Sequence, residues 1–150
     1  MSATLRIGIP LLALSLAACA TVPPPVTDFA TRQAVLEEAL GEIGRPYRYG
    51  GGDADGFDCS GLVHYVFEQA GVELPRTAAE QRRAGRAIDF RDAAPGDLVF
   101  YRFGNTLHAT IYVGDDRVVH APASGQTVTV TRVDNDYWRE RLVSVVRILN

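Results

Sequence analysis

The sequence predicts one α+β domain, in which helices from the first half of the chain pack on one side of an antiparallel sheet built from the second half. Three observations lead to this expectation. Apolar residues recur at helical spacing before residue 85, and runs rich in Val, Ile, Tyr and Phe follow Pro95-Gly96. The chain has 150 residues, of which 47% are hydrophobic, so it has room for a single compact core. Helices followed by successive strands favour an antiparallel sheet with the helices on one face.

A first helix is expected to begin after a cap at Thr27 or Asp28 and to end at Gly44-Arg45-Pro46. Its apolar residues recur at the spacing of one helix face. They are Val35, Leu36, Ala39, Leu40 and Ile43. The segment that follows, 47–57, is rich in Gly and Asp and is expected to be a loop.

A second helix is expected to begin after a cap at Asp58 and to end at Gly71. It is placed by a second set of apolar residues at helical spacing, which would fasten it to the core. They are Leu62, Val63, Val66, Phe67 and Ala70. A short third helix is expected at 77–84.

Five strands are expected in the second half, each in a short run rich in β-branched and aromatic residues. Their ranges are 98–102, 109–113, 118–120, 127–132 and 143–149. Gly114-Asp115-Asp116 and Ser124-Gly125 are expected to be turns between strands. The expected architecture is therefore an α+β core in which the N-terminal helices pack on an antiparallel five-stranded sheet.

The first 27 residues are expected to be an export signal and a tether rather than part of the fold. Arg6 precedes an uncharged stretch, 7–18, that is too short to span a bilayer, and the stretch ends in Leu16-Ala17-Ala18-Cys19. This order resembles a bacterial lipobox, in which cleavage before the cysteine leaves its sulfur attached to lipid. Residues 1–18 would then be removed, and Cys19 would anchor the protein to a membrane. An ordinary secreted protein with a chance cysteine at the cleavage site is the alternative.

The predicted tether, 19–27, carries three consecutive prolines, which favour an extended spacer before a folded domain at 28–150. Ala20 follows the cysteine, and in such lipoproteins of two-membrane bacteria the absence of Asp at this position favours the outer membrane. The expected location is the cell envelope, with the domain facing the periplasm.

Charge excludes several function classes. The formal net charge is -3, from 15 basic and 18 acidic residues, and the basic residues are scattered rather than gathered in a stripe, which argues against nucleic-acid binding. All 15 basic residues are arginines, so no lysine is present to form a Schiff base or a Ser-Lys dyad.

Cys59 is the first candidate for chemistry. With Cys19 modified by lipid, Cys59 has no disulfide partner in an oxidising compartment. It directly follows the predicted cap Asp58, at the first turn of a helix, where unpaired amides and the helix dipole favour a thiolate. A reactive nucleophile and a buried structural cysteine are both compatible with this position.

Two histidines are candidates for the base that a cysteine nucleophile needs. His108 begins the strand 109–113, and His120 ends the next strand. They would share a face of the sheet after a three-residue turn and lie on opposite faces after a two-residue turn. Even on one face they are expected to be offset by four residues, about 13 Å, unless a bulge shortens the gap. His64 lies about 140° around the helix from Cys59 and is expected on the solvent side.

Six short segments occur in one order along the chain and together resemble the NlpC-type cell-wall peptidases from about residue 30 to the end. They are Pro46-Tyr47-Arg48-Tyr49-Gly50-Gly51, Asp58-Cys59-Ser60-Gly61-Leu62-Val63, Leu74-Pro75-Arg76-Thr77, Pro95-Gly96-Asp97-Leu98-Val99-Phe100, His108 through Gly114, and His120-Ala121. The resemblance implies a papain-like cysteine peptidase that needs no metal or other cofactor. Its substrate would be peptidoglycan stem peptides, cut between D-γ-glutamate and meso-diaminopimelate.

The resemblance also implies a role for each catalytic position. Cys59 would be the nucleophile, His108 its base, and His120 the polar residue that orients His108. The hydroxyl of Tyr47 would stabilise the oxyanion together with the amide of Cys59. We expect the thiol and imidazole to form a thiolate-imidazolium pair at neutral pH.

Further residues of the motifs have less specific expected roles. Asp58 and Ser60 would bind polar groups of the substrate, although helix capping explains them nearly as well. Arg76 would meet a carboxylate of the stem peptide or be a solvated surface charge. Asp97 is expected to be a turn residue without a chemical role.

Three other functions stay open at this point. Cys59, His108 and His120 could bind zinc as a hydrolase site, although their spacing lacks a zinc motif. The same thiol chemistry could transfer acyl groups between lipids. A lipid-anchored wall-binding protein without turnover is the third alternative, and the sequence indicates no protein partner for any of them.

Overall fold

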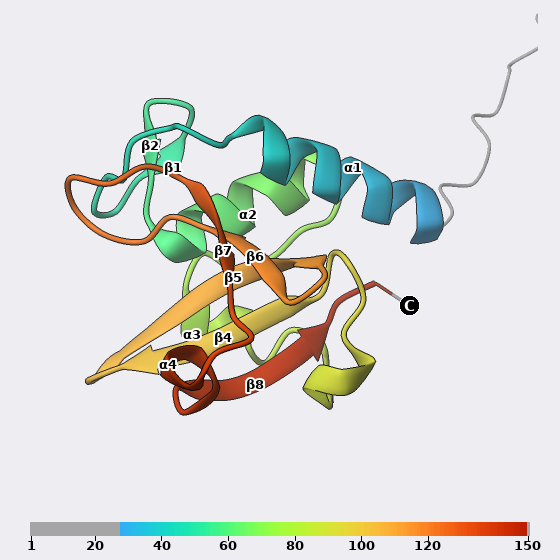
Figure 1. The fold of residues 1–150 in the computed structure, drawn as a ribbon. Helices are drawn as coiled ribbons and strands as arrows, with labels where there is room; N and C mark the ends of the chain where they lie inside the picture. The colour runs from blue at the N-terminus through green and yellow to red at the C-terminus, as the bar shows by residue number, and fades with distance from the viewer. Residues whose placement is uncertain (1–27, 150) are drawn as a thin grey trace, which may run out of the picture.

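Helices α1 (Asp28–Gly41) and α2 (Cys59–Gln69) lie on one side of a six-stranded sheet, with α1 packed on α2 and α2 packed on the sheet (Figure 1). This computed structural model describes residues 28–149, so the predictions for the signal peptide, Cys19 and the tether lie outside the described residues. The remaining helices are short: α3 (Ala78–Gln81), the 3-10 helix η1 (Phe90–Asp92) and α4 (Asp136–Arg139).

The large sheet has the order β3-β8-β4-β5-β6-β7, and each neighbouring pair is antiparallel. Its strands are β3 (Arg86–Ile88), β4 (Leu98–Phe103), β5 (Thr106–Gly114), β6 (Arg117–His120), β7 (Thr129–Arg132) and β8 (Leu142–Arg147). A separate two-stranded sheet joins β1 (Gly52–Asp53) to β2 (Gly56–Phe57), inside the segment predicted to be a loop.

The predicted α+β architecture and the five predicted strands are confirmed, but the predicted strand count is wrong because β3 adds a sixth strand at the edge beside β8. Arg86 and Ala87 are exposed and only Ile88 is partly buried, so this segment has no alternating apolar pattern to reveal it. The predicted third helix is also shorter than expected, since α3 ends at Gln81.

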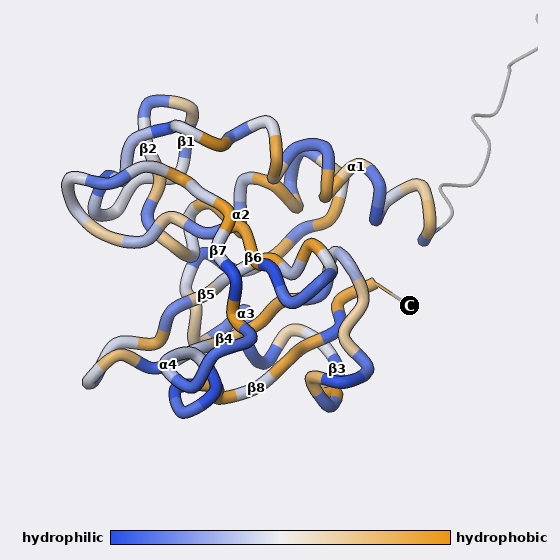
Figure 2. The backbone as a smooth tube through the Cα atoms, in the orientation of Figure 1, coloured by the Kyte–Doolittle hydropathy of each residue, from blue (hydrophilic) through white to orange (hydrophobic). Residues whose placement is uncertain are grey.

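The two long helices begin and end close to where the sequence places them. Asp58 caps α2, with its carboxylate accepting a hydrogen bond from the Gly61 amide at 2.7 Å, and Gly71 follows the helix with a φ of +78°. The buried face of α1 is narrower than the apolar pattern suggests, because Leu40 is 46% exposed and Ile43, which lies beyond the end of the helix, is 45% exposed. Figure 2 shows this helix alternating between hydrophobic and hydrophilic residues along its length.

Apolar side chains cover both faces of the sheet. The larger cluster lies between the helices and the sheet and includes Val35, Phe67 and Ile111. On the opposite face a second cluster contains Tyr101 and Trp138. Because α4 contributes Trp138 to this second face, the sheet is buried on both sides near the end of the chain.

Asp97 ties the first helix to the last strand. Its carboxylate is 0% exposed and lies 3.2 Å from Nη1 of Arg32 in α1 and 2.7 Å from Nη2 of Arg147 in β8. It also accepts a hydrogen bond from the Ala94 amide at 2.8 Å. Asp97 is therefore more than the plain turn residue that we expected from the sequence, because it is the centre of a buried ion-pair network.

The connection from β5 to β6 decides which residues share a face. Gly114, Asp115 and Asp116 have φ values of +93°, +52° and +53°, as the predicted turn requires. Only two residues separate the paired Gly114 and Arg117, and a bulge then shifts the register by one residue. A two-residue turn alone would put His108 and His120 on opposite faces; the bulge returns them to the same face.

The offset between the two histidines is shorter than four residues, and the bulge that the sequence analysis named as the exception is present. In the register set by Ile111 and Val119, His120 lies opposite Thr110, which is two residues from His108. Side chains in this diagonal relation across two strands are within reach of one another when they are long or aromatic. The strand register thus brings the two imidazoles together.

Candidate active site

The centre of the site is a hydrogen-bonded pair of histidines. Nε2 of His108 lies 2.8 Å from Nδ1 of His120, with the two rings 5.1 Å apart and nearly perpendicular. Nε2 of His120 lies in turn 2.9 Å from Oγ1 of Thr131, in the neighbouring strand β7. Three adjacent strands therefore each contribute one member of a hydrogen-bonded chain.

The hydrogen bonds from His108 to His120 and from His120 to Thr131 leave one ring nitrogen of His108 without a partner among them. Because Nε2 is bonded to His120, Nδ1 is the nitrogen that can accept a proton. For Nδ1 to be unprotonated, neutral His108 must carry its hydrogen on Nε2 and donate it to His120. His120 then carries its own hydrogen on Nε2 and donates to Thr131. The arrangement thus fits one tautomer of each ring when His108 serves as a base.

Both rings are buried among aromatic side chains. His108 is 7% exposed and meets Phe103 edge-on at 5.7 Å, while His120 is 4% exposed and meets Trp138 edge-on at 5.5 Å. Burial, with the neighbouring His120, lowers the pKa of His108 to about 3, and burial lowers the pKa of His120 to about 4. Both histidines are therefore neutral at pH 7.

Cys59 is the first residue of α2 and contacts β5 one residue from His108. The backbone amides of Ala109, Ser60 and Cys59 itself lie near enough to the sulfur to lower the pKa of the thiol. Burial nevertheless raises the pKa of the thiol, and the charge of Asp58 raises it further, against the lowering effect of these amides. Burial thus shifts the Cys59 thiol and the His108 imidazole each toward the neutral form, and the expected thiolate-imidazolium pair stays a prediction.

Asp58 and Arg76 are bonded to each other. Nη1 and Nη2 of Arg76 donate to the two carboxylate oxygens of Asp58 at 2.9 and 2.8 Å, and Nη2 also donates to the Gly51 carbonyl at 2.9 Å. Burial alone would raise the pKa of the Asp58 carboxyl, but Arg76, the Gly61 amide and the Ser60 hydroxyl outweigh it, and the pKa is lowered. Neither of the two predicted roles of Arg76 describes this pairing.

The ion pair between Asp58 and Arg76 holds the N-terminal end of α2 in place. Asp58 accepts from the amide of Gly50 at 3.1 Å, and Arg76 donates to the hydroxyl of Ser60 at 3.1 Å. A Cβ at Gly61 would lie 2.0 Å from the Gly51 carbonyl oxygen, so this close approach requires glycine. The loop 50–51 and the start of α2 are therefore fixed against each other next to Cys59.

The hydroxyl of Tyr47 is close enough to the Cys59 thiol for the two groups to interact electrostatically. Burial raises the pKa of this hydroxyl, and the charges of Cys59 and Asp58 add to the effect, which places the three groups within electrostatic range. The Tyr47 amide donates to the Gln126 carbonyl at 2.8 Å, so the residue is anchored to the segment between β6 and β7. The position is compatible with the predicted contact to an oxyanion.

His64 takes no part in this group. Its Nδ1 lies 2.7 Å from the Leu74 carbonyl oxygen, and the side chain is partly buried rather than free in solvent. The hydrogen bond holds the segment that follows α2. The sequence correctly separates His64 from the site, but misses this structural contact.

Three residues of the site region are missed by the sequence analysis. Thr131 bonds His120, Trp138 packs on His120, and buried Gln81 donates to the Ser60 carbonyl at 2.9 Å. Thr131 carries no signal of its own, because its contact depends on the pairing Val118↔Thr131 and the side chain's face, which only the register reveals.

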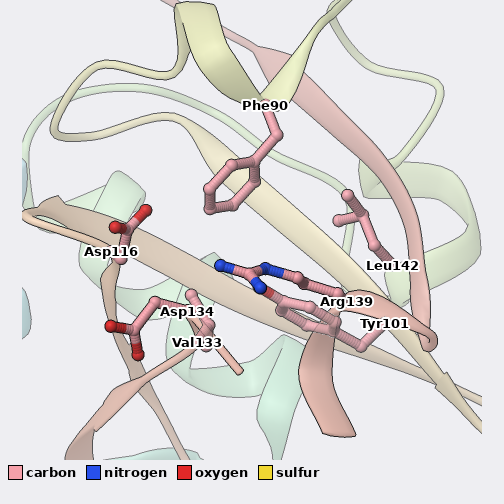
Figure 3. A pocket seen from close by; sticks show the side chains of 7 residues that line it. All are labelled: Phe90, Tyr101, Asp116, Val133, Asp134, Arg139 and Leu142. Atoms are coloured by element: carbon pink, nitrogen blue, oxygen red, sulfur yellow. The ribbon is translucent and has the colours of Figure 1, made fainter. Parts of the chain in front are cut away.

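A cavity of about 560 Å³ adjoins the histidines. His108, His120, Thr131, Gln126, Tyr137 and Trp138 are among the residues that line it. A smaller cavity of about 160 Å³ lies elsewhere, between η1, β4 and α4, and contains none of the site residues above. Figure 3 shows Arg139 extending its guanidinium across this smaller cavity, toward the side where Asp116 and Asp134 lie.

The geometry does not resemble a metal centre. His108 and His120 direct facing nitrogens at each other, so these two rings and Cys59 do not aim at a common ion. Among residues 28–149, no group of three or more His, Cys, Asp or Glu side chains is placed to hold a metal. Within the same range, no helix is both long and apolar enough to cross a bilayer.

Comparison with known proteins gives the family. Residues 44–147 match the NlpC/P60 family over most of the chain. The chain belongs to the NlpC/P60 family. The resemblance found in the sequence and the papain-like α+β fold are thereby confirmed.

Among curated relatives, the bifunctional muramidase/DL-endopeptidase CwlT of Bacillus subtilis is 44% identical over 123 residues, which cover 77% of this chain and 36% of CwlT. The murein DD-endopeptidase MepH of Escherichia coli is 37% identical over 133 residues, covering 80% of this chain and 46% of MepH. The chain thus spans between a third and a half of these two relatives.

Among solved structures, the peptidoglycan hydrolase RipB of Mycobacterium tuberculosis aligns with a TM-score of 0.74 and 33% identity. The alignment covers 85% of this chain and 69% of RipB. The sheet and helices described above therefore match an NlpC/P60 domain in arrangement as well as in sequence.

Proposed function

We propose that this protein is a cysteine endopeptidase of peptidoglycan, with Cys59 as nucleophile, His108 as base and His120 as the residue that orients His108. The observation that carries the proposal is the 2.8 Å contact between Nε2 of His108 and Nδ1 of His120, which leaves Nδ1 of His108 available, with Cys59 at the start of α2, the helix that packs on the same strand β5. This arrangement supplies a cysteine at a helix start and, on the strand that this helix packs against, an imidazole with one nitrogen available. The names of the relatives, which include peptidoglycan hydrolases and DL-endopeptidases, support the same class.

RipA, to which this chain is 32% identical, has been solved in one structure mutated at a histidine and in another mutated at a cysteine. The separation of those two positions in RipA equals the separation of Cys59 and His108 in this chain. This agreement supports the assignment of both residues.

The first half of the reaction makes an acyl-enzyme. The Cys59 thiol passes its proton to Nδ1 of His108 as the sulfur bonds to the scissile carbonyl carbon. The oxyanion is stabilised by the Cys59 amide and the Tyr47 hydroxyl. The His108 imidazolium then protonates the leaving amine as the carbon-nitrogen bond breaks, which leaves a thioester on Cys59 and neutral His108.

The second half releases the acid. His108 takes a proton from water as the water oxygen bonds to the thioester carbonyl, and the imidazolium returns that proton to the sulfur as the carbon-sulfur bond breaks. His120, neutral because of burial, accepts the Nε2 hydrogen of His108 throughout and keeps the ring in one orientation.

The bond that we propose is the one between D-γ-glutamate and meso-diaminopimelate in a stem peptide. The support is that one relative is named a DL-endopeptidase and another a gamma-DL-glutamyl hydrolase. MepH, by contrast, is named a DD-endopeptidase, so the products have to decide between these two bonds.

The proposed location is the cell envelope, with the protein attached to a membrane through lipid on Cys19. The order Leu16-Ala17-Ala18-Cys19 supports this, as does the proline-rich segment that would separate the lipid from α1. The outer membrane is proposed on the basis of Ala20.

Digestion of defined muropeptides followed by mass analysis tests the activity. The wild-type protein should release fragments cut after D-γ-glutamate, and C59A should release none. H64Q is the matched control, since His64 is a histidine of the same helix that faces away from the site, and it should cut like the wild type. Binding of muropeptides without cleavage, or acyl transfer on phospholipid with no peptide cleavage, would contradict the proposal.

A further inference from the structure

Gln81 is a buried polar side chain that the reaction described above does not use. It is the last residue of α3 and is 0% exposed. Its Nε2 donates to the Ser60 carbonyl at 2.9 Å and to the Pro75 carbonyl at 2.8 Å. These two acceptors fix the orientation of the amide, because the amide oxygen in the same place would face two carbonyl oxygens. Both hydrogens of the amide nitrogen are therefore in use.

The oxygen of the same amide has no partner. Oε1 of Gln81 is buried and, within residues 28–149, accepts no hydrogen bond. A buried oxygen without a hydrogen bond lowers the stability of a fold. What glutamine supplies in return is a single nitrogen that donates to two carbonyls from different segments of the chain.

The two carbonyls belong to peptide groups that lead to the same ion pair. The Ser60 carbonyl shares a peptide group with the Gly61 amide, which donates to Asp58 at 2.7 Å. The Pro75 carbonyl belongs to the peptide group of Arg76, and the guanidinium of Arg76 donates to both carboxylate oxygens of Asp58. The donor nitrogen, the two peptide groups and the ion pair therefore form one closed network. Its members, called here the Gln81 network, are Asp58, Ser60, Gly61, Pro75, Arg76 and Gln81.

The Gln81 network encloses the nucleophile. Cys59 lies in the chain between Asp58 and Ser60, and the network holds the peptide group after Ser60 from both its carbonyl and its amide side. The Cys59 amide is one of the two oxyanion donors of the proposed reaction. Such a donor is effective when its position is fixed before the reaction begins.

We infer that Gln81 is a positioning residue of the active site, which fixes the first turn of α2 and the segment of Arg76 against each other so that Cys59 meets the scissile carbonyl in one geometry. The inference rests on the function proposed above. Because Gln81 is fully buried, it touches neither the substrate nor the reacting atoms. Its loss should therefore lower kcat and leave KM nearly unchanged.

Substitutions of Gln81 test this split. Q81M keeps the length of the side chain without its donors, and its kcat for muropeptide cleavage should fall about tenfold with KM within about twofold of the wild-type value. Q81E has at most one hydrogen to donate, so it cannot bond both carbonyls and should also lose activity. All assays are run well below the unfolding temperature of each variant.

Two controls separate positioning from stability. Q33M makes the same change at an exposed glutamine of α1 and should behave like the wild type. V66A removes packing from a fully buried position of α2 without removing a side-chain hydrogen bond. It should lower the unfolding temperature and keep kcat within about twofold of the wild-type value.

Double-mutant cycles show whether Gln81 acts through the network. R76M opens the Gln81 network, so the addition of Q81M should lower kcat by less than a further factor of about two. Thr131 shares no partner with Gln81. In the control cycle, the losses of T131V and Q81M should therefore multiply.

Amide hydrogen exchange reports on the network without turnover. The exchange of the Gly61 amide, which donates to Asp58, should become about tenfold faster in Q81M and Q81E and stay unchanged in Q33M. Wild-type kcat in Q81M or Q81E would overturn the inference, as would losses that multiply in the cycle with R76M. Should Q81M fail to fold, Q81E takes its place in both measurements. A wild-type protein that cleaves no muropeptide, combined with faster Gly61 exchange in the variants, would instead contradict the proposed function and leave the network standing.

Discussion

Burial decides the protonation of His108 and His120, because each ring is enclosed by aromatic side chains and its nearest polar partners are neutral. A charged imidazole in this setting would lose its hydration without gaining a carboxylate. Both histidines therefore stay neutral at pH values near 6.5, at which most histidines begin to take up a proton. This has one consequence for stability and another for catalysis.

The consequence for stability is sensitivity to acid. In the unfolded chain both histidines have the ordinary pKa of about 6.5, while in the folded protein the values are about 3 and about 4. Between these limits the unfolded state binds more protons, so the free energy of unfolding should fall as pH falls below 6.5. The slope is at most about 1.4 kcal/mol per pH unit for each histidine, and neither contributes above pH 7.

Denaturant unfolding at pH 7 and pH 5 measures this slope. H120Q keeps a hydrogen-bonding side chain but cannot titrate, so its slope over this range should be smaller than that of the wild type by the share of one histidine. An unchanged slope in H120Q would show that His120 is not held neutral by the fold.

The consequence for catalysis concerns Thr131, which we predict to be a positioning residue. Its hydroxyl accepts the Nε2 hydrogen of His120 and so fixes the tautomer that accepts from His108. T131V removes one hydrogen bond in a buried chain and should lower kcat about five- to tenfold with little change in KM. T131S, which keeps the hydroxyl, should restore most of kcat. Equal losses in both variants would indicate that Thr131 acts only through packing.

At the scale of elements, the sequence predicts best those parts of the site that depend on local structure. The cap at Asp58, the start of α2 at Cys59 and the turn at 114–116 follow from residue preferences within one turn of the chain, and the structure confirms each. Placing Cys59 at a helix start therefore needs no tertiary information.

The parts of the site that the sequence does not predict depend on contacts between elements. The bulge between Tyr112 and Gly114 brings His108 and His120 together, and no residue in the sequence marks it. The two-bond ion pair between Arg76 and Asp58 joins residues of two different sequence motifs. In the sequence, each of these residues taken by itself therefore suggests a polar group without a partner. Register and long-range pairing are set by the packing of the whole sheet, which the pattern of one strand does not contain.

Asp97 gives a prediction at this scale, since its carboxylate joins α1, β8 and the loop before β4. D97A would leave Arg32 and Arg147 without their partner and should lower the free energy of unfolding by about 3 to 5 kcal/mol. The control is D89A, because the Asp89 pair with Arg91 is exposed and local to η1. Denaturant titration of both variants should show a large loss in the first alone; similar losses would contradict a central role for Asp97.

At the scale of the whole molecule, the site opens on one side of the sheet while α1 leads away from it. Figure 1 shows the described chain beginning at the end of α1 that is remote from β1 and β2. Cys59, at the start of α2, lies beside the two-stranded sheet. An attachment that precedes Asp28 would therefore hold the domain from the far end of α1 and leave the approach to Cys59 open.

The proposed anchor at Cys19 can be tested on this basis. C19A should prevent lipid attachment, and the protein should move from the membrane fraction to the soluble fraction of the envelope, because a single proline-rich segment without lipid has no means of holding it there. Cleavage of free muropeptides should be unchanged, since Cys19 lies outside the domain and Cys59 is intact. C59A is the reciprocal control: it should stay in the membrane fraction and lose cleavage. Membrane association of C19A equal to that of the wild type would contradict the lipid anchor, while the assignment of Cys59 would be unaffected.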